Sequence, residues 1–342
     1  MRKYCLSLLL LFLTLVSNAV EPPKREIRGV WLTTVYGLDW PHNPATTETG
    51  RKAQQRDVCD ILDRLQDANF NTVFLQVRMR GDVIWRSAIE PASKTFSGKY
   101  GMMPGYDPLA FVVDECHKRG MECHAWFVTF PLGTDKSVKE QGKLSVVRRQ
   151  PKLCKRHNGE WYLDPGVPGT SDYVLSLVKE LVNGYDIDGI HFDYIRYPEQ
   201  AKSFPDKNLY NKYGKKRPLA EWRRENINKM VYRIYDWVKS VKPWIQVSSS
   251  PLGKYNRIER VPNAGWTAYE SVFQAPKMWM QNGNQDMIVP MMYYLHDNFF
   301  PFVDNWVDNC NGRLVVPGLG AYRMLKEEAD WTVNDITDQI DY

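Results

Sequence analysis

The stretch DGIHFDYIRYPE, residues 188–199, places ionisable side chains inside a pattern typical of a buried strand. Because an unpaired charge is costly to bury, Asp193 needs either a partner or a chemical task. Side chains alternate between the two faces of a strand. We therefore expect His191 and Asp193 on one face, and Phe192 and Tyr194 on the opposite face, toward the helices.

Two further strand-like stretches, 71–79 and 122–128, carry polar or aromatic pairs with the same alternation. These pairs are Gln76 with Arg78, and His124 with Trp126. If all these faces point to one side of the sheet, the side chains converge near the strand ends. Taken alone, each residue could equally well be a polar group of the core whose hydrogen bonds are satisfied by its neighbours. For the whole set, a functional site is favoured.

Carboxylates among aromatic side chains fit glycoside hydrolysis, in which one carboxyl protonates the leaving oxygen and another attacks or activates water. Trp40, at the rim after the first predicted strand, and Trp126 are candidate platforms for sugar rings. A tryptophan is, taken singly, more often part of the core. No second carboxylate stands out, so a carbohydrate-binding protein on a hydrolase-like barrel stays open as an alternative.

Other chemistries have weaker support in the sequence. No serine or cysteine lies in a recognisable nucleophile motif, and the histidines show no tight metal-ligand spacing. His124, His191 and Asp193 could still meet around a metal, which leaves a metal-dependent deacetylase or esterase open. No phosphate-binding glycine loop is present, so we expect neither a cofactor nor a resident metal.

Strand-like and helix-like patterns alternate along the chain, which indicates parallel βα units. The strands are expected at 27–35, 71–79, 122–128, 188–197, 244–251, 286–294 and 313–322, and the main helices at 57–68, 108–120, 171–185 and 221–241. Without a G-x-G-x-x-G turn after the first strand, an α/β (β/α)₈ TIM barrel is favoured over a doubly wound sheet. The count is one strand short, which suggests a C-terminal truncation or a missed strand. Two long connections, 129–170 and 198–218, follow strands and belong on the active-site face of such a barrel.

The N-terminus has the pattern of a secretory signal peptide over residues 1–19, with a basic start, an apolar run and small residues at Ser17–Ala19. We therefore expect an exported protein, periplasmic or extracellular, without a stable membrane anchor, whose single barrel domain spans residues 20–342. The formal net charge of +5 is mild and scattered, so nucleic acid is not an expected partner. The irregular cysteine spacing indicates neither a disulfide framework nor a zinc site. The oligomeric state stays open.

Several ordered motifs resemble the glycosyl-hydrolase-like 10 family of exported bacterial proteins. They are RGVWLTTVYGLDWP, FNTVFLQVRMRGDVIWRSAIEPAS, PGYDPLAFVVDECHKRGMECHAWF, WYLDPG and DGIHFDYIRYP, and the resemblance covers residues 26–325. It implies a TIM barrel and glycoside hydrolase activity. Some members resemble enzymes that cut peptidoglycan glycan strands stripped of stem peptides, so this substrate is implied by resemblance. Members usually extend beyond the end of this chain, in agreement with the missing strand.

The resemblance assigns Asp193, in HFDYIRYP, as the nucleophile or main catalytic carboxylate. Its partner acid is open, with Asp82 ranked first, then Asp297, Asp164 and Glu90. Arg196 is expected to pair with a loop carboxylate. The residues expected to bind or orient the polysaccharide are Arg78, Gln76, His124, Trp126, His191, Trp40 and Asp164.

Overall fold

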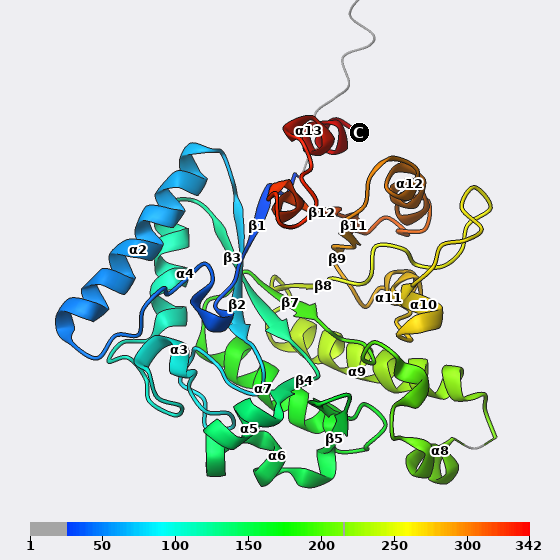
Figure 1. The fold of residues 1–342 in the computed structure, drawn as a ribbon, viewed down its shortest axis with the longest axis horizontal. Coiled ribbons are helices and arrows are strands. Elements are labelled where there is room, and N and C mark those ends of the chain that lie inside the picture. The colour runs from blue at the N-terminus through cyan, green and yellow to red at the C-terminus, as the bar shows by residue number, and fades with distance from the viewer. Residues whose placement is uncertain (1–25, 215) are drawn as a thin grey trace, which may run out of the picture.

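A computed structural model describes residues 26–214 and 216–342, so the predicted signal peptide lies outside the described residues. One parallel sheet of seven strands forms the centre of the molecule (Figure 1). In spatial order its strands are β1 (Gly29–Leu32), β2 (Thr72–Arg78), β3 (Glu122–Val128), β7 (Gly189–Asp193), β8 (Gln246–Ser249), β9 (Met287–Ile288) and β11 (Leu314–Val315). Each predicted strand stretch contains one of them, and the half-barrel that they form confirms the barrel class.

Helices that follow the strands cover the outside of the sheet (Figure 1). The longest are α2 (Glu48–Asp67), α4 (Pro108–Lys118), α7 (Thr170–Gly184) and α9 (Leu219–Val241). Helix α4 begins where the Asp107 side chain accepts a hydrogen bond from the Ala110 amide and Pro108 occupies the first turn. Helix α2 begins nine residues earlier than predicted, behind the capping Thr47. No helix in the described part of the chain has the length and apolar character needed to cross a membrane.

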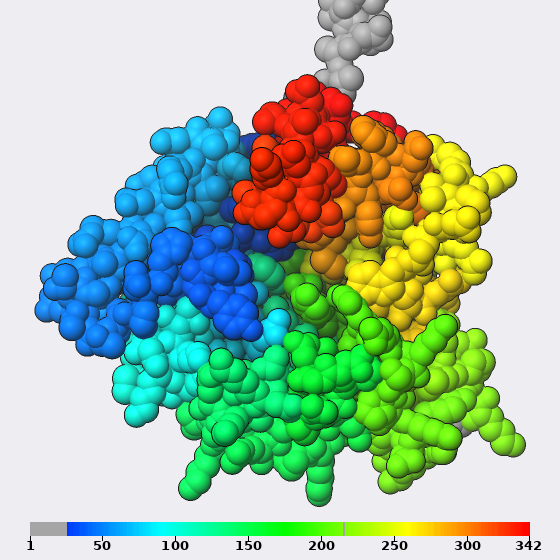
Figure 2. Space-filling view, viewed as in Figure 1, coloured from blue at the N-terminus to red at the C-terminus, as the bar shows by residue number. Residues whose placement is uncertain are grey.

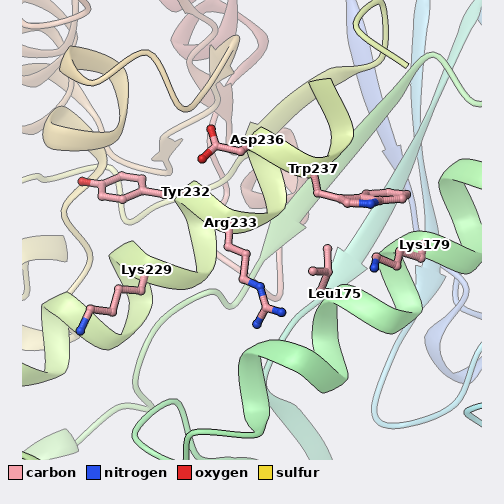
Figure 3. Close-up of a pocket in the computed structure, with 7 residues that line it drawn as sticks. All are labelled: Leu175, Lys179, Lys229, Tyr232, Arg233, Asp236 and Trp237. Carbon is pink, nitrogen blue, oxygen red and sulfur yellow. The ribbon is translucent and has the colours of Figure 1, made fainter. Parts of the chain in front are cut away.

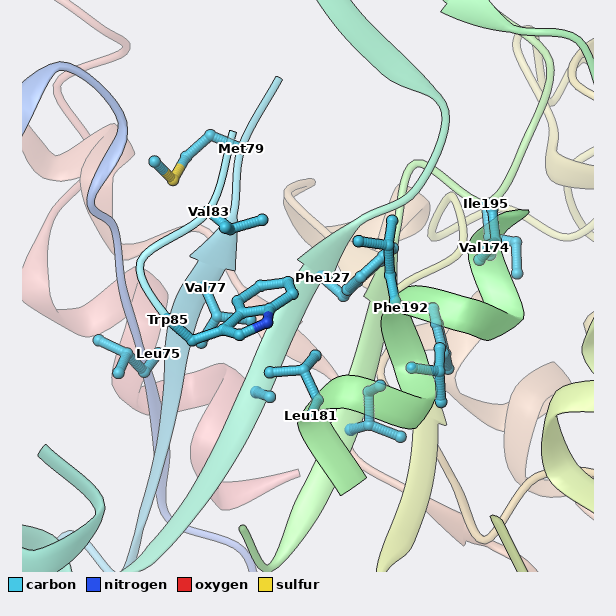
Figure 4. Close-up of a cluster of buried hydrophobic side chains, with 14 of the residues drawn as sticks. Leu75, Val77, Met79, Val83, Trp85, Phe127, Val174, Leu181, Phe192 and Ile195 are labelled. Carbon is cyan, nitrogen blue, oxygen red and sulfur yellow. The ribbon is translucent and has the colours of Figure 1, made fainter. Parts of the chain in front are cut away.

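The sheet separates two apolar regions. Figure 4 shows part of the outer region, which contains Leu75, Val77 and Phe127 of the sheet together with Val174 and Leu181 of α7. Burial of such side chains is the main stabilising contribution to a fold of this type. The inner region is smaller and fills the space enclosed by the sheet; it contains Phe74, Met287, Val289, Ile27, Trp31, Trp126, Leu314 and Val316.

The edges of the sheet approach each other without pairing. Within the described residues, β1 and β11 share no ladder of hydrogen bonds. A short parallel pair, β10 (Met291–Met292) with β12 (Gly318–Leu319), continues the late strands. A Cβ atom on Gly318 would lie 2.7 Å from the Trp31 ring, so the absence of a side chain lets this ring pack across the gap.

The two long connections are ordered. Residues 129–170 form an antiparallel sheet of β4 (Pro131–Thr134), β6 (Glu160–Leu163) and β5 (Cys154–His157), with α5 (Asp135–Gln141) and α6 (Val146–Arg149) between them. Residues 198–218 include α8 (Lys207–Tyr213). Arg223 of α9 holds this second connection through two hydrogen bonds to Asp206, of 2.8 and 2.7 Å.

An irregularity in β2 reverses the expected orientation of Arg78. Gln76 pairs with Trp126, but Arg78 already pairs with Phe127, so the register shifts between them. A bulge of this kind turns the following side chain to the other face. The guanidinium of Arg78 therefore lies 5.1 Å from the Phe127 ring on the helix side. The prediction that Arg78 shares a face with Gln76 and binds substrate was wrong.

Arg78 instead forms a buried ion pair with Glu90. Its Nε and Nη2 atoms each donate to a carboxylate oxygen at 2.7 Å, and neither side chain is exposed. The hydroxyl of Tyr173 on α7 donates to the same carboxylate at 2.8 Å. Glu90 therefore has a structural role in the outer core, and the prediction that it could be the partner acid was wrong.

Replacing Glu90 by glutamine should lower the free energy of unfolding by about 3–5 kcal/mol, because the Arg78 charge stays buried without a counterion. Urea unfolding measures this change. The matched control is Glu48→Gln, which breaks the exposed pair with Lys52 and should cost less than about 1 kcal/mol. Equal small effects of both substitutions would contradict the structural role of the buried pair.

Asp164 is buried where the chain passes from β6 to α7. Its Oδ1 atom accepts a hydrogen bond of 2.8 Å from the Gly166 amide, while Oδ2 has no partner. Burial raises the pKa of this carboxyl to about 6. With 0% of its surface exposed, Asp164 cannot contact a polysaccharide, so its assignments as a substrate-binding residue and as a partner acid were wrong.

Asp164→Asn should stabilise the protein at pH 7 and leave it nearly unchanged below pH 4. The pKa of Asp164 is about 6 when folded and about 3.9 when unfolded, so folding favours the protonated form. Wild-type stability therefore falls as pH rises from about 4 to 6, by at most about 3 kcal/mol. Unfolding at the two pH values, with exposed Asp186→Asn as control, measures the difference. If Asp164→Asn raised the free energy of unfolding by the same amount at both pH values, the raised pKa of Asp164 would be contradicted.

Candidate active site

Asp193 is the last residue of β7 and lies at the carboxyl end of the parallel sheet. Its Oδ2 atom accepts a hydrogen bond of 3.1 Å from the Trp126 indole, and Oδ1 accepts one of 2.7 Å from the Tyr194 amide. The residue is 6% exposed. A side chain of β3 and the backbone amide just after β7 thus fix the orientation of a nearly buried carboxylate, as a catalytic group requires.

The environment of Asp193 acts on its pKa in both directions. Burial is the largest effect and raises the pKa above its usual value. The charge of Arg196 and the hydrogen bonds from Tyr194 and Trp126 lower it and limit the increase. The result is a poorly solvated carboxylate, more basic than an exposed one, that is suited to attack an electron-poor carbon or to accept a proton.

His191 lies two residues before Asp193 and forms the layer beneath it. Its Nδ1 atom is 2.9 Å from the Ser248 hydroxyl, and its Nε2 atom is 3.4 Å from the Trp31 indole nitrogen. An indole N–H only donates, so Nε2 is the acceptor and Nδ1 carries the proton. Burial lowers the pKa of His191 to about 3. This imidazole is therefore neutral. It connects Ser248 and Trp31 within the layer and has no exposed surface.

His124 lies one layer deeper than Trp126 on β3. Its Nε2 atom is 3.0 Å from a carboxylate oxygen of Glu122 at the opposite end of the strand. A Cβ atom on Gly189 would lie 2.3 Å from its ring, so this glycine makes room for the histidine. His124 is fully buried. It does not reach the Asp193 carboxylate, and the prediction that it orients this group or the substrate was wrong.

The metal-dependent alternative finds no site in this arrangement. His124 and His191 occupy different layers, and the Nε2 lone pair of His191 accepts from Trp31. No group of three or more His, Cys, Asp or Glu side chains within residues 26–214 and 216–342 has a metal-binding arrangement.

Gln76 holds the loop that follows β1. Its Oε1 atom accepts hydrogen bonds of 2.9, 3.0 and 2.8 Å from the Thr33 hydroxyl, the Thr34 amide and the Val35 amide. This loop contains the turn η1 (Val35–Gly37) and carries the exposed Tyr36 on the rim. The direct role of Gln76 in the structure is therefore to position a loop.

Trp40 lies in the core. Its indole donates a hydrogen bond of 2.8 Å to the Gln54 carbonyl of α2 and packs edge-on against Phe96, with ring centroids 4.8 Å apart. The side chain has no exposed surface. The prediction that Trp40 is a sugar platform at the rim was wrong, because the chain turns inward after η1.

Asp82 lies in a cleft of about 320 Å³ beside the carboxyl end of β2. Tyr36 and Arg80 also line this cleft. Burial raises the pKa of Asp82, although the Ser93 side chain and the Arg80 amide partly oppose this. A carboxyl with a raised pKa can hold the proton that a leaving glycosidic oxygen needs. Burial raises the pKa of Tyr194, the neighbour of Asp193, and the charge of Arg80 partly opposes this increase.

Asp297 has a different environment. It lies exposed on the short turn η5 (His296–Asn298), after β10. None of the hydrogen bonds or ion pairs found in the described residues joins it to Asp193. The same holds for Asp82, so the two residues differ in burial, with Asp82 6% exposed and Asp297 exposed, and the role of each stays a prediction.

Three rim residues were missed in the sequence. Burial raises the pKa of Tyr293, and the Asp193 charge adds to this increase. The Tyr322 ring is 5.5 Å from that of Tyr293. Glu160 pairs with Arg80 at 3.1 Å and accepts a hydrogen bond of 2.7 Å from the Tyr162 hydroxyl. The signals in the sequence were Tyr293 in MMYYLHDN, Tyr322 in PGLGAY and the glutamate just before WYLDPG, whereas our prediction considered the aspartates.

The face shown in Figure 2 is hollowed at its centre, where segments from the early, middle and late parts of the chain meet. A separate groove lies between α7 and α9 on the helical exterior (Figure 3). It is lined by Leu175, Lys179, Lys229, Tyr232, Arg233, Asp236 and Trp237. This groove contains none of the residues at the carboxyl ends of the strands, where barrels of this class carry out chemistry.

Comparisons with known proteins agree with the architecture. The sequence model of the family glycosyl hydrolase-like 10 matches residues 26–306. Glycosyl hydrolase DigH of Escherichia coli (strain K12) is 33% identical over 343 residues, which cover 92% of this chain and 78% of DigH. Glycosyl hydrolase YngK of Bacillus subtilis (strain 168) is 33% identical over 282 residues, which cover 79% of this chain and 54% of YngK.

Among solved structures, the PgaB (BpsB) glycoside hydrolase domain from Bordetella bronchiseptica superposes with a TM-score of 0.55 at 14% identity. The match covers 84% of this chain and 82% of that domain, and it supports the fold. The family match includes Asp193, every strand from β1 to β10, and α12 (Phe300–Val307) except its last residue. The chain therefore belongs to the glycosyl hydrolase-like 10 family.

Proposed function

We propose that this protein hydrolyses glycosidic bonds in a polysaccharide, with Asp193 as the main catalytic carboxylate. The observation that carries the proposal is the position of Asp193 at the carboxyl end of β7, where Trp126 and the Tyr194 amide orient it in a nearly buried site. Relatives named glycosyl hydrolases, at 33% identity over most of this chain, support the same reaction class.

The proposed reaction uses two carboxyl groups. Asp193 attacks the anomeric carbon or activates a water molecule, while Asp82, whose pKa is raised by burial, protonates the leaving oxygen. Tyr194 is exposed beyond the end of β7 and offers its ring to the sugar. The expectation that Tyr194 faces the helices was wrong, because its backbone has a φ of +49° and turns the chain at the strand end.

The proposed substrate is the glycan of peptidoglycan, and the proposed place of action is the periplasm or the cell exterior. Both rest on the family resemblance and on the signal-like N-terminus. The exposed aromatic side chains on the rim, Tyr36, Tyr194 and Trp266, suit a ring-shaped ligand.

A carbohydrate-binding protein without hydrolysis is the second candidate. Two observations favour it: Glu90 and Asp164 are both buried away from the rim, which leaves fewer carboxyls as partners for Asp193. Incubation with glycan would then show binding without new reducing ends.

Asp193→Asn should lower the release of soluble fragments from denuded glycan strands by about a hundredfold or more, because the amide neither attacks nor accepts a proton. The substitution retains the shape of the side chain and removes a buried charge, so the melting temperature should stay close to that of wild type. A reducing-end assay with purified protein measures the rate.

Asp186→Asn is the control, because it makes the same chemical change at an exposed residue that precedes β7 and lies away from the site. Full activity of the Asp193 variant would overturn the assignment of the catalytic carboxylate. If wild-type protein binds the strands and releases no reducing ends, the second candidate replaces the first.

A further inference from the structure

Arg196 is a buried cation on the rim, three residues after Asp193. Its side chain lies between two aromatic rings, with the guanidinium carbon 4.8 Å from the Tyr194 centroid and 5.1 Å from the Trp266 centroid. The arginine is only 6% exposed, whereas both flanking rings are exposed to solvent. The two rings cover the guanidinium, and the stacking stabilises the cation.

No acceptor for Arg196 is found in the part of the chain that the structure describes. Its Nε atom is buried without a hydrogen-bond partner, and no ion pair is formed. The expected salt bridge to a loop carboxylate is therefore wrong. The other two deeply buried arginines differ, because Arg78 and Arg223 each make two hydrogen bonds to a carboxylate, on Glu90 and Asp206.

A buried guanidinium without a counterion is unfavourable for folding. Asp193 is near enough for Arg196 to lower its pKa, but no hydrogen bond or ion pair joins the two among the described residues, so the N–H groups of Arg196 remain available to a further anion. The ionisable groups that act on the same region are Asp193, whose pKa Arg196 lowers, and the hydroxyls of Tyr194 and Tyr162. Tyr162 already donates to Glu160. None of these groups occupies the N–H edge of Arg196.

We propose that Arg196 binds a carboxylate carried by a sugar of the glycan, so that the site selects acidic polysaccharide. This inference rests on the proposed function of the same site. With its faces covered by rings and its Nε atom buried, the guanidinium can meet a ligand through its two Nη atoms, which match the two oxygens of a carboxylate. The ligand carboxylate must approach from the side away from Asp193, because the two anions repel each other.

The proposal distinguishes two forms of the same glycan. Peptidoglycan strands stripped of stem peptides carry free lactyl carboxylates, whereas strands with stem peptides carry the same carbons as amides. An amide has no charge and offers one oxygen. Arg196 would therefore favour the stripped strands, independently of any steric effect of the peptides.

The test compares denuded glycan strands with the same strands after conversion of the carboxylates to methyl amides. The kcat/KM of wild type should be about 10- to 100-fold higher for the strands with free carboxylates than for the methyl amides, because the amides cannot form a charged hydrogen-bonded pair with Arg196. Arg196→Gln should abolish this preference, and Arg196→Lys should restore part of it, because lysine keeps the charge and loses the planar fork.

Arg233→Gln is the matched control, since Arg233 lies in the outer groove between α7 and α9 (Figure 3) and pairs with Asp172. This variant should keep the wild-type preference. Calorimetry should show an unchanged or higher melting temperature for Arg196→Gln, because the substitution breaks no ion pair. If the glutamine variant does not fold, the glycan preference of Arg196→Lys is compared with that of wild type instead. A preference that survives in the Arg196 variants would overturn the proposal.

Binding separates this proposal from the proposed hydrolysis. Titration calorimetry with both glycans on wild type and Arg196→Gln does not depend on bond cleavage. If wild type cleaves neither glycan but binds the carboxylate form more tightly through Arg196, the anion site stands and the hydrolase assignment fails. If both glycans bind equally well, the anion site is overturned whether or not the strands are cut.

Discussion

The register of four neighbouring strands is the constraint on which the site depends. Gln76, Trp126, His191 and Ser248 are paired across β2, β3, β7 and β8 and form one layer inside the sheet. Asp193 lies one step above this layer, within reach of the Trp126 indole. Because side chains alternate, a slip by one residue in β2 or β7 would exchange Gln76 or His191 for an apolar side chain that now faces the helices.

The protein treats its buried charges in two ways. Toward the helices, Arg78 with Glu90 and Arg223 with Asp206 are closed pairs that leave little for a ligand to bind. On the rim, Asp193 receives neutral donors and Arg196 receives aromatic rings, so both charges are held without a carboxylate–guanidinium bond between them. The charges available to a ligand therefore lie at the carboxyl ends of the strands, whereas the closed ion pairs hold the sheet and the helices together.

Strand positions and the place of Asp193 could be predicted, because apolar runs with period two define a strand and its end. The bulge before Arg78 could not, since one additional residue in a strand leaves no mark in the alternation. Trp40 and Asp164 were misplaced for another reason: whether a loop turns toward solvent or inward depends on tertiary packing. The Arg196 stack joins residues 70 positions apart, Arg196 and Trp266, and only the folded chain brings them together.

Trp31 packs across the gap between the sheet edges and also donates to Nε2 of His191. Separation of the edges would withdraw this donor and admit water to an imidazole whose pKa is now held near 3 by burial. In the opened form the ring would regain a pKa of about 6.5 and bind a proton more readily. Any opening of the sheet edges and proton uptake by His191 would therefore be linked equilibria, and acidification would shift both in the same direction.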